Sequence, residues 1–342
     1  MTNGLIIATI VLLASCSGGK NEGKKANNKQ NSSYPVTIEN VTKSEGTAVG
    51  ENVWQKKEQT FDEAPKKVVA NTRPAAELLL HLGLKDRIAG VGAVFGQEDP
   101  TVAKEFDTLN HLSDQYISKE VALSVDPDLI YGRGGLFDNA EWGVGTVDSL
   151  NEMGIPTYVL ESSTNTGTFD DIYQDIDNLG KIFNVEDQAT TFKQELKDRQ
   201  KALADKLKAI KEEKTFAYLH TDDPENLYVY SLTDDSFSLS VFDMVKLENA
   251  FPDLTGEVPL ETMIAADPDV LIVPIFDGFG GKDSKAAKLV EALYKNPKLS
   301  SLKAIKNKEV YILDYNYMFG YGYQSLDGVE QLAKEMYPDL FK

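Results

Sequence analysis

The sequence predicts an α/β fold of two Rossmann-like lobes joined by a long, rigid helix. Three observations lead to this prediction. Short apolar runs alternate with stretches of helical period, one motif occurs once in each half, and an uninterrupted amphipathic stretch separates the two copies. Alternating strand and helix patterns are typical of α/β proteins with mostly parallel strands. Roughly 300 residues follow the N-terminal segments, which is enough chain for two domains of ordinary size.

Residues 1–16 have the pattern of a lipoprotein signal peptide. The apolar run over residues 5–14 is too short to cross a hydrocarbon core about 30 Å thick, but it fits the apolar region of a secretory signal. Residues 13–16, which are Leu, Ala, Ser and Cys, resemble a bacterial lipobox, so Cys16 is the expected site of lipidation by diacylglyceryl and palmitate groups. The first four residues lack the Lys or Arg with which such signals normally begin.

Residues 17–50 are expected to form a flexible tether between this anchor and the folded part. From 17 to 33 the chain holds small and polar residues without a large apolar side chain, so it cannot bury enough surface to offset the entropy of ordering. Cys16 is the only cysteine, which excludes an internal disulfide and a metal site built from several cysteines.

The charge balance excludes one class of partner. The whole chain carries a formal charge of −19, and because the tether is basic, the folded part is even more acidic. Nucleic-acid binding requires a basic footprint, so we expect no nucleic-acid partner. The anchor and the charge together predict a protein at the extracytoplasmic face of a cell membrane.

Residues 51–185 are expected to form an N-terminal lobe and residues 215–342 a C-terminal lobe. Short apolar runs predict buried strands at residues 68–71, 88–91, 129–131, 157–160, 216–219, 228–230, 270–275 and 310–313. Stretches of helical period predict helices at residues 74–82, 142–153, 169–183, 237–246, 284–294 and 325–337.

One motif with the spacing E-x5-D-P-D, followed by an apolar run, occurs in both lobes. The first copy begins at Glu120 and the second at Glu261, 141 residues later. Each copy reads as a short helix that a proline turn ends before a buried strand begins. Two copies in the same frame predict two lobes of similar plan.

A long helix is expected over residues 186–214, between the lobes. Its apolar residues fall at helical spacing among charged ones, and no glycine or proline interrupts it. At 1.5 Å per residue such a helix is about 40 Å long. A rod of this length limits how far two lobes can hinge; the alternative is a surface helix that belongs to one lobe.

Five segments carry a resemblance to a known family, residues 34–40, 64–70, 77–91, 178–183 and 296–311. In these segments, and in their order, the chain from residue 34 onward resembles the class of periplasmic binding proteins that serves importers of ferric siderophores, haem and cobalamin. The resemblance implies two α/β lobes bridged by a long helix, with the ligand in the cleft between them. It also implies a monomer that delivers its ligand to the permease dimer and ATPase of an ABC importer, here on a Gram-positive cell surface.

The same resemblance implies a role for two carboxylates. Members of the class carry a surface glutamate on each lobe, which docks into basic pockets of the importer. By their place in the repeated motif, these residues are Glu120 and Glu261. The alternative is that both are ordinary solvated carboxylates at helix starts, where the helix dipole favours them.

Candidate ligand-binding residues lie at the carboxyl ends of the predicted strands, because ligands of open α/β sheets bind there. Arginine is scarce, at positions 73, 87, 133 and 199, and two of these four follow predicted strands. A guanidinium group makes forked hydrogen bonds to anionic oxygens and stacks on planar groups. The candidates are Arg73, Tyr131, Arg133, Trp142, Ser162, His220, Tyr230, Phe276, Tyr315 and Tyr317.

Aromatic residues are the second signal for a binding surface. Tyr315, Tyr317, Phe319, Tyr321 and Tyr323 fall within nine residues, mixed with glycines, and such a loop is a good amphipathic surface. Core packing is the alternative for each of these aromatics. For the two arginines the alternative is structural pairing with a nearby acid.

Neither a metal centre nor an intrinsic cofactor is expected. The three histidines are His81, His111 and His220, and of these His220 alone follows a predicted strand, so a histidine cluster for direct metal binding is absent. Ligation of haem iron by tyrosine or by His220 stays open, since tyrosinate suits Fe(III).

The function expected from the sequence is binding without catalysis. The chain has no G-x-S-x-G, no H-E-x-x-H and no phosphate-binding loop, and its single cysteine lies in the lipobox. The expected ligand is a ferric siderophore of hydroxamate or catecholate type, whose iron keeps its own ligands. Haem or cobalamin binding is the alternative within the class, and a cell-surface hydrolase that uses carboxylates is the alternative outside it.

Overall fold

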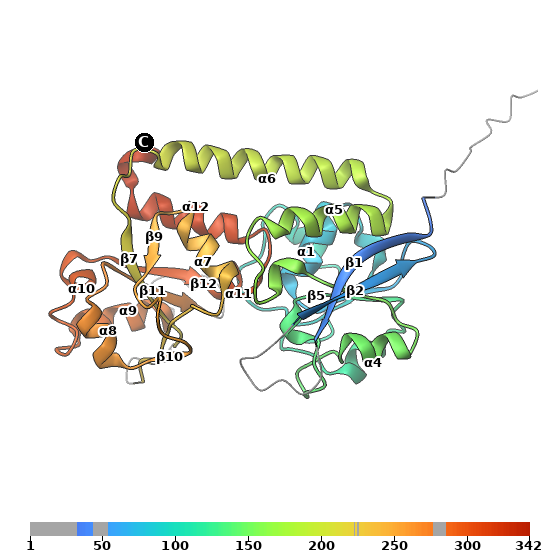
Figure 1. Cartoon of the computed structure of the whole chain (residues 1–342), viewed down its shortest axis with the longest axis horizontal. Helices are drawn as coiled ribbons and strands as arrows, with labels where there is room; N and C mark the ends of the chain where they lie inside the picture. Colours follow the sequence, from blue (N-terminus) through green and yellow to red (C-terminus); the bar gives the residue numbers. More distant parts are fainter. Residues whose placement is uncertain (1–32, 44–53, 222, 224–225, 276–284) are drawn as a thin grey trace, which may run out of the picture. The chain divides into compact units, whose positions relative to one another are not determined.

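The computed structural model describes residues 33–43, 54–221, 223, 226–275 and 285–342, which form three β-sheets and the helices packed around them (Figure 1). We call residues 33–185 the N-terminal half and residues 214–342 the C-terminal half. The predicted α/β class with parallel strands and a long helix is confirmed. Among the described residues, none of the helices combines the length and the apolar character that crossing a membrane requires.

The N-terminal half contains a four-stranded parallel sheet in the order β4-β3-β5-β6, with a two-stranded antiparallel hairpin, β1-β2, beside it. Its strands are β1 (Val36–Lys43), β2 (Trp54–Phe61), β3 (Val68–Ala70), β4 (Ile88–Val91), β5 (Leu129–Gly132) and β6 (Thr157–Val159). Its helices are α1 (Arg73–His81), α2 (Ala103–Phe106), α3 (Lys119–Leu123), α4 (Val147–Glu152) and α5 (Asp171–Phe183).

The C-terminal half contains a six-stranded sheet in the order β10-β8-β7-β11-β12, with β9 also paired to β7. Its strands are β7 (Lys214–Leu219), β8 (Val229–Tyr230), β9 (Leu247–Asn249), β10 (Glu257–Val258), β11 (Val270–Ile275) and β12 (Val310–Asp314). Its helices are α7 (Ser236–Asp243), α8 (Leu260–Ala266), α9 (Lys285–Lys295), α10 (Lys303–Asn307), α11 (Tyr315–Phe319) and α12 (Ser325–Met336).

Strand β1 corrects the predicted tether, which extended to residue 50. Residues 36–43 are a strand because Ile38 and Val41 are buried and because Asn40 is fixed by two hydrogen bonds. The Asn40 amide donates to the carbonyl of Thr157 (2.7 Å) and accepts from the amide of Val159 (3.1 Å), so the side chain joins the hairpin to β6. Residues 17–32 and 44–50 of the predicted tether, and the signal peptide with Cys16, lie outside the described residues.

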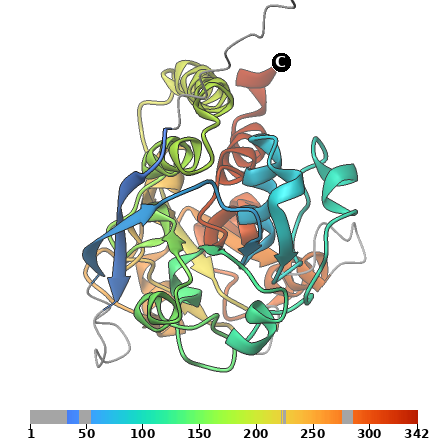
Figure 2. The ribbon, with the colours of Figure 1, turned by 90° about the vertical axis from the view of Figure 1, so that its right-hand side faces the viewer.

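The helix expected over residues 186–214 is α6 (Glu186–Leu207), which ends seven residues earlier. Beyond Leu207 the chain turns, the Ile210 amide donates to the Leu207 carbonyl, and Lys214 already begins β7. At 1.5 Å per residue α6 is about 33 Å long. It packs on α5 and α12, and Figure 2 shows it end-on above α5. Arg199 of α6 forms ion pairs with Asp327 and Glu330 of α12.

The two copies of the repeated motif have the same local structure. Asp126 and Asp267 both adopt left-handed backbone conformations, with φ of 53° and 50°, directly before the prolines. Asp128 then accepts hydrogen bonds from the backbone amides of Lys66 and Lys67, which lead into β3. Its counterpart in the other half, Asp269, accepts one from the Thr215 amide of β7. Each motif therefore fixes the start of a buried strand beside a neighbouring strand.

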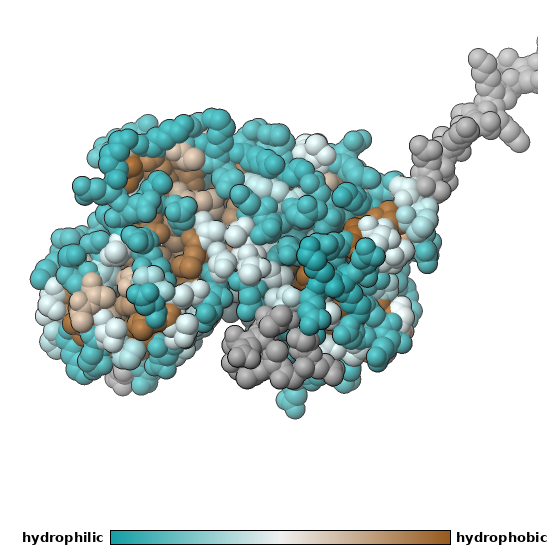
Figure 3. Space-filling view, in the orientation of Figure 1, coloured by the Kyte–Doolittle hydropathy of each residue, from teal (hydrophilic) through white to brown (hydrophobic). Residues whose placement is uncertain are grey.

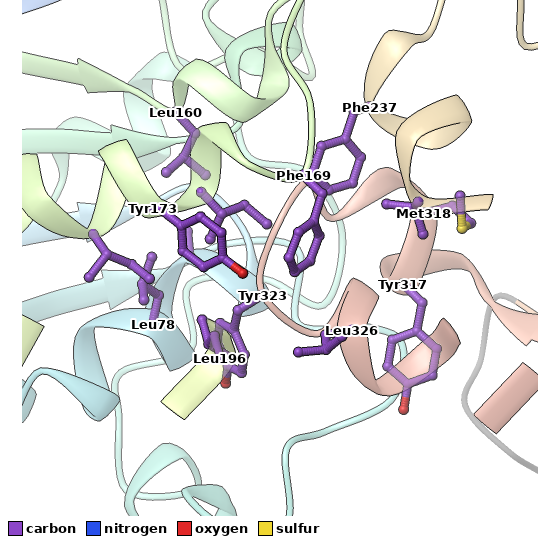
Figure 4. Close-up of a cluster of buried hydrophobic side chains, with 14 of the residues drawn as sticks. Leu78, Leu160, Phe169, Tyr173, Leu196, Phe237, Tyr317, Met318, Tyr323 and Leu326 are labelled. Carbon is purple, nitrogen blue, oxygen red and sulfur yellow. The ribbon is translucent and has the colours of Figure 1, made fainter. Parts of the chain in front are cut away.

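A single hydrophobic cluster includes residues of both halves and of α6. Figure 4 shows part of it, with Leu78 of α1, Leu196 of α6 and Phe237 of α7 among the buried side chains. Two smaller clusters lie within one half each. On the face seen in Figure 3 the surface is mostly hydrophilic, and apolar residues gather between α6 and the elements beneath it.

Buried polar side chains also join the two halves, close to α6. Gln324 donates to Glu77 (2.6 Å), and Tyr323 donates its hydroxyl proton to Asp99 (2.6 Å). His81 hydrogen-bonds to the same Asp99 carboxylate (2.8 Å) and stacks on a phenyl ring of α6. Burial opposes ionisation of Asp99, but its hydrogen bonds with His81, Thr101 and Tyr323 hold its pKa below the usual range. We call these residues the buried network.

Glu77 gives the buried network a dependence on pH. Burial, only partly offset by the Asp99 amide and by Arg73, raises the pKa of Glu77 from 4.5 to about 7. The folded state therefore holds this proton more tightly than the unfolded chain does. The resulting stabilisation is complete below pH 4.5 and is lost as the pH rises through 7.

The first prediction concerns Glu77→Gln. Between pH 5 and pH 8 the wild type should lose on the order of 2 kcal/mol of unfolding free energy more than this variant does, because the variant has no proton to lose at position 77. Urea unfolding at both pH values measures this difference. Glu98 is exposed and directly precedes Asp99, so Glu98→Gln is the control. Its unfolding free energy should change between the two pH values as that of the wild type does. Parallel curves for Glu77→Gln and wild type would contradict the prediction.

Candidate binding site between the two halves

A cavity of about 680 Å³ is lined by residues of both halves. Its walls come from segments that follow the carboxyl ends of β5, β6, β7 and β12, where the sequence predicts the site. The lining residues are Arg133, Ser163, Thr164, Asn165, His220, Tyr228, Tyr230, Asp234, Asp235, Thr255, Gly256, Tyr315, Phe319 and Tyr321.

The backbone of Arg133 is fixed by Asn71, which follows β3. The Arg133 amide donates to Oδ1 of Asn71 (2.8 Å), and Nδ2 of Asn71 donates to the Arg133 carbonyl (3.0 Å). Gly132 allows this approach, since its φ is 136° and a Cβ there would lie 2.0 Å from Oδ1 of Asn71. Buried Asn71 therefore positions the segment that carries the arginine into the cavity.

The Arg133 guanidinium lies among tyrosines. Its Nη1 donates to the Tyr116 hydroxyl (3.1 Å), and its central carbon lies 5.1 Å from the centroid of the Tyr321 ring. Burial raises the pKa of Tyr116 to about 12, so this phenol stays neutral at physiological pH. Arginine keeps its charge at any such pH. The cavity wall of the N-terminal half therefore presents one permanent positive charge.

The C-terminal half contributes an aromatic wall. Tyr315 stacks on Phe319, with ring centroids 4.9 Å apart, and His220 meets Phe319 edge-on at 5.4 Å. The ring centroids of Tyr228 and Tyr230 each lie 6.1 Å from that of His220. Burial, together with the positive charge of Arg133, lowers the pKa of His220, so its imidazole is neutral at pH 7. Aromatic rings, with apolar faces and polar edges, therefore make up much of this wall.

Tyr321 connects the two walls. Its carbonyl accepts a hydrogen bond from Ser162 of the N-terminal half (2.8 Å), and its hydroxyl donates to buried Asp235 of the C-terminal half (3.0 Å). Burial raises the pKa of Asp235, and hydrogen bonds with Ser238 and Tyr321 partly oppose that shift. Tyr321 itself has a left-handed backbone conformation, with φ of 51°. Both of its hydrogen bonds therefore depend on a conformation that is costly for tyrosine.

Four predicted ligand-binding residues, Arg133, His220, Tyr230 and Tyr315, line this cavity together. Trp142 is 47% exposed and does not line it. Phe276 lies outside the described residues. The structure brings Arg133, His220, Tyr230 and Tyr315 together from the ends of four strands, β5, β7, β8 and β12. Their contact with a ligand remains a prediction.

Four other predicted residues do not line this cavity; three are buried and the fourth, Arg73, is partly buried. Tyr131 is in the core and donates its hydroxyl proton to the Ala75 carbonyl. Arg73 packs over a phenyl ring, 4.3 Å from its centroid, and lies 3.5 Å from Glu77. Ser162 is fully buried beneath Tyr321. Tyr317 packs against Gly328 of α12, where an added Cβ would lie 2.7 Å from it.

Sequence reasoning missed several lining residues. Tyr228 is two residues before Tyr230 in a predicted strand, and residues two apart in a strand lie on the same face. Because Tyr230 was a predicted site residue, this spacing could have identified Tyr228 as well. Phe319 and Tyr321 belong to the predicted aromatic cluster, though they were not singled out as ligand contacts. Asn165 and Asp234 lie in turns, Asp235 caps α7 and Thr255 lies in a loop, and nothing in their sequence pattern marks them as ligand contacts.

Glu120 and Glu261 are both exposed, and each lies in the first turn of its helix, α3 or α8. Hydrogen bonds from its own backbone amide and from Ser118 lower the pKa of Glu120. Both carboxylates are therefore available to a partner, and docking remains a prediction. Within the described ranges, no three His, Cys, Asp or Glu side chains are grouped so as to hold a metal ion.

A cavity between two α/β halves, walled by strand-end residues and bridged by one long helix, defines a binding protein of two-lobed type. Residues 68–317 match the family described as Periplasmic binding protein, and the chain belongs to that family. The resemblance recognised in the sequence is thus confirmed. The family consists of the substrate-binding proteins of transporters, and the predicted class, an ABC importer's substrate-binding protein, is confirmed with it.

Individual relatives agree with this assignment. The chain is 26% identical to the uncharacterized ABC transporter substrate-binding lipoprotein YvrC of Bacillus subtilis strain 168, over 98% of this chain and 96% of that protein. It is 27% identical to the Fe(3+)-citrate-binding protein YfmC of the same organism, over 74% and 77%. A crystal structure of a periplasmic binding protein from Veillonella parvula DSM 2008 has a TM-score of 0.76 at 21% identity, covering 89% of this chain and 99% of that one.

The second prediction tests Asn71 as a positioning residue. Asn71→Ala removes both hydrogen bonds to the Arg133 backbone, so the arginine loop should lose its fixed position and the unfolding free energy should fall by about 2 kcal/mol. Chemical denaturation measures the loss. Hydrogen exchange should show faster exchange of the Arg133 and Gly134 amides. Unchanged exchange at these two amides would contradict the assignment.

Proposed function

We propose that the protein captures a ferric siderophore of hydroxamate or catecholate type in the cavity between its halves and delivers it to the permease dimer of an ABC importer, which an ATPase drives. The observation that carries the proposal is the cavity itself, where one fixed guanidinium faces a wall of neutral aromatic rings. One relative is named a Fe(3+)-citrate-binding protein, which supports iron chelates as the ligand class.

The chemistry of the walls fits the outside of an iron chelate rather than a bare ion. Hydroxamate, catecholate and carboxylate oxygens around Fe(III) carry negative charge, to which a guanidinium donates charge-assisted hydrogen bonds. Tyrosine, phenylalanine and neutral histidine rings pack on the planar organic arms of such a chelate. The iron keeps its own ligands, so the protein needs no intrinsic cofactor and performs no catalysis.

Capture at a membrane surface completes the proposed cycle. Lipidation of Cys16 would keep the protein, proposed to be a monomer, at the extracytoplasmic face close to its importer. A relative named as a lipoprotein supports the anchor. Exposed Glu120 and Glu261 would then dock the loaded protein, one from each half. The join across α6 and the buried network favours a modest hinge motion over a wide opening.

The third prediction is that Arg133→Ala weakens binding of a ferric siderophore roughly 10- to 100-fold, since a charge-assisted hydrogen bond contributes about 1.5–3 kcal/mol. Quenching of tryptophan fluorescence in a titration measures the affinity. Arg87 donates to the Pro65 carbonyl away from the cavity, so Arg87→Ala serves as the control and should bind as the wild type does. Equal affinities for Arg133→Ala and wild type would rule out this cavity as the binding site.

The same titration separates the ligand classes. Ferric hydroxamate, ferric catecholate, haem and cobalamin each have a distinct visible absorption spectrum, so the bound species is identified directly. Tight binding of haem or cobalamin, without binding of either ferric chelate, would replace the proposed ligand by one of the alternatives within the same family.

The fourth prediction concerns docking. Reversing both Glu120 and Glu261 to Lys should leave ligand affinity within about twofold but reduce uptake at least tenfold, because like charges across an interface oppose association. Uptake of radioactive iron by cells that depend on this protein measures the effect. Glu152 and Glu248 are also exposed, one in each half, and their reversal to Lys is the matched control. Normal uptake by the first double variant would refute the docking assignment.

A further inference from the structure

The chain that directly follows β6, residues 161–165, connects several parts of the cavity, and we call it the β6 turn. Its last three residues line the cavity. The Ser163 hydroxyl accepts a hydrogen bond from the amide of Gly134 (2.7 Å), the residue after the arginine of the N-terminal wall. The Ser162 hydroxyl donates to the carbonyl of Tyr321 (2.8 Å). The position of this turn therefore sets where the arginine loop and Tyr321 lie relative to each other.

A carboxylate of α5 holds the β6 turn by its backbone. Asp175 is fully buried, and it does not line the cavity. Its Oδ1 accepts a hydrogen bond from the amide of Glu161 (2.8 Å), and its Oδ2 accepts one from the amide of Ser162 (3.1 Å). Tyr158 of β6 also donates its hydroxyl proton to Oδ1 (2.7 Å). Both oxygens of this carboxylate therefore act as acceptors, each for one of two successive backbone amides.

Placing an acid here costs free energy. Burial raises the pKa of Asp175 to about 7, although Glu161, Tyr158 and Ser162 all donate hydrogen bonds to it. An uncharged side chain of similar size would avoid this desolvation penalty. An amide side chain, however, has one acceptor oxygen and one NH2 group, so it cannot accept from both backbone amides at once. The carboxylate is therefore matched to the backbone of the β6 turn.

We infer that Asp175 is a positioning residue of the binding site, which acts by holding the β6 turn. Through Ser162 it sets the place of Tyr321, and through Ser163 it sets the place of the Arg133 loop. This inference rests on the proposed function and adds a residue that acts on the ligand only through others. Helix α5 thereby contributes to binding without lining the cavity.

The test compares Asp175→Asn with Tyr158→Phe. In either orientation the asparagine NH2 group faces one backbone amide of the turn, which loses its acceptor, so Asp175→Asn should bind a ferric chelate about fivefold more weakly than the wild type. Tyr158→Phe removes a donor to the same carboxylate but leaves both amides paired. It should lower the unfolding free energy and still bind within about twofold of the wild type. Fluorescence titrations with a ferric trihydroxamate and a ferric tris-catecholate measure affinity, and chemical denaturation measures stability.

Two further measurements separate positioning from a general loss of stability. Ser162→Ala should also weaken binding, and its combination with Asp175→Asn should lose less affinity than the sum of the two single losses, because both changes act on the same contact with Tyr321. Hydrogen exchange needs no ligand. The amides of Glu161, Ser162 and Gly134 should exchange faster in Asp175→Asn but at the wild-type rate in Tyr158→Phe.

Failure of the positioning role and failure of the proposed function give different results. Equal affinities of Asp175→Asn and Tyr158→Phe, or additive losses in the double variant, would overturn the role of Asp175 while chelate binding by the wild type upholds the proposed function. A wild type that binds neither complex would overturn the proposed function. Unchanged exchange of the turn amides in Asp175→Asn would overturn the positioning role whichever ligand binds.

Discussion

The segment from Asp314 to Ser325 is the constraint on which the rest of the structure depends. It leaves the end of β12 in the C-terminal half and reaches the N-terminal half, where Asn316 donates to the Phe95 carbonyl and Asp314 accepts from the Gln97 amide. Its next residues supply Tyr321 to the cavity and Tyr323 to the buried network. One segment therefore joins the halves and builds the site, so the distance between the two cavity walls is fixed largely by its own hydrogen bonds.

Electrostatics at the cavity run against the charge of the chain. With a formal charge of −19, the protein repels anions at long range, and screening at physiological salt limits that repulsion to about 8 Å. Inside the cavity Arg133 is half-buried among phenols, where its field is screened less. Asp234 and Asp235 lie near this positive charge, but they do not offset it to the same extent. Asp235 already accepts hydrogen bonds from Ser238 and Tyr321. Affinity for an anion therefore depends on local geometry rather than on net charge.

Local sequence patterns were sufficient for most of the fold but not for the side-chain roles. Buried strands such as residues 270–275 appear with the predicted bounds, because a long apolar run has few other solutions. The hairpin strands were missed because β2 is polar throughout between Trp54 and Phe61 and because Asn40, a polar residue, is what attaches the hairpin to β6. Tyr131 and Arg133 show the limit at the site. They are two residues apart at one strand end, yet Tyr131 is buried in the core and Arg133 lines the cavity. The alternation of side chains along a strand does not predict side-chain direction once the strand has ended.

The repeated motif shows how the sequence sets the site without contributing a lining residue. Asp128 and Asp269 each fix the amino end of a strand by accepting a hydrogen bond from the backbone of a neighbouring segment. The carboxyl end of that strand therefore has a defined position relative to its neighbour in the sheet. In the N-terminal half that position places Arg133 where Asn71 can hold it. In the C-terminal half the same device aligns β11 with β7, whose end carries His220. Because the motif's glutamates stand on the helices just before these turns, the exposed carboxylates are tied to the strands that carry the cavity walls. A rearrangement of one half would therefore shift its exposed motif glutamate and its cavity wall together.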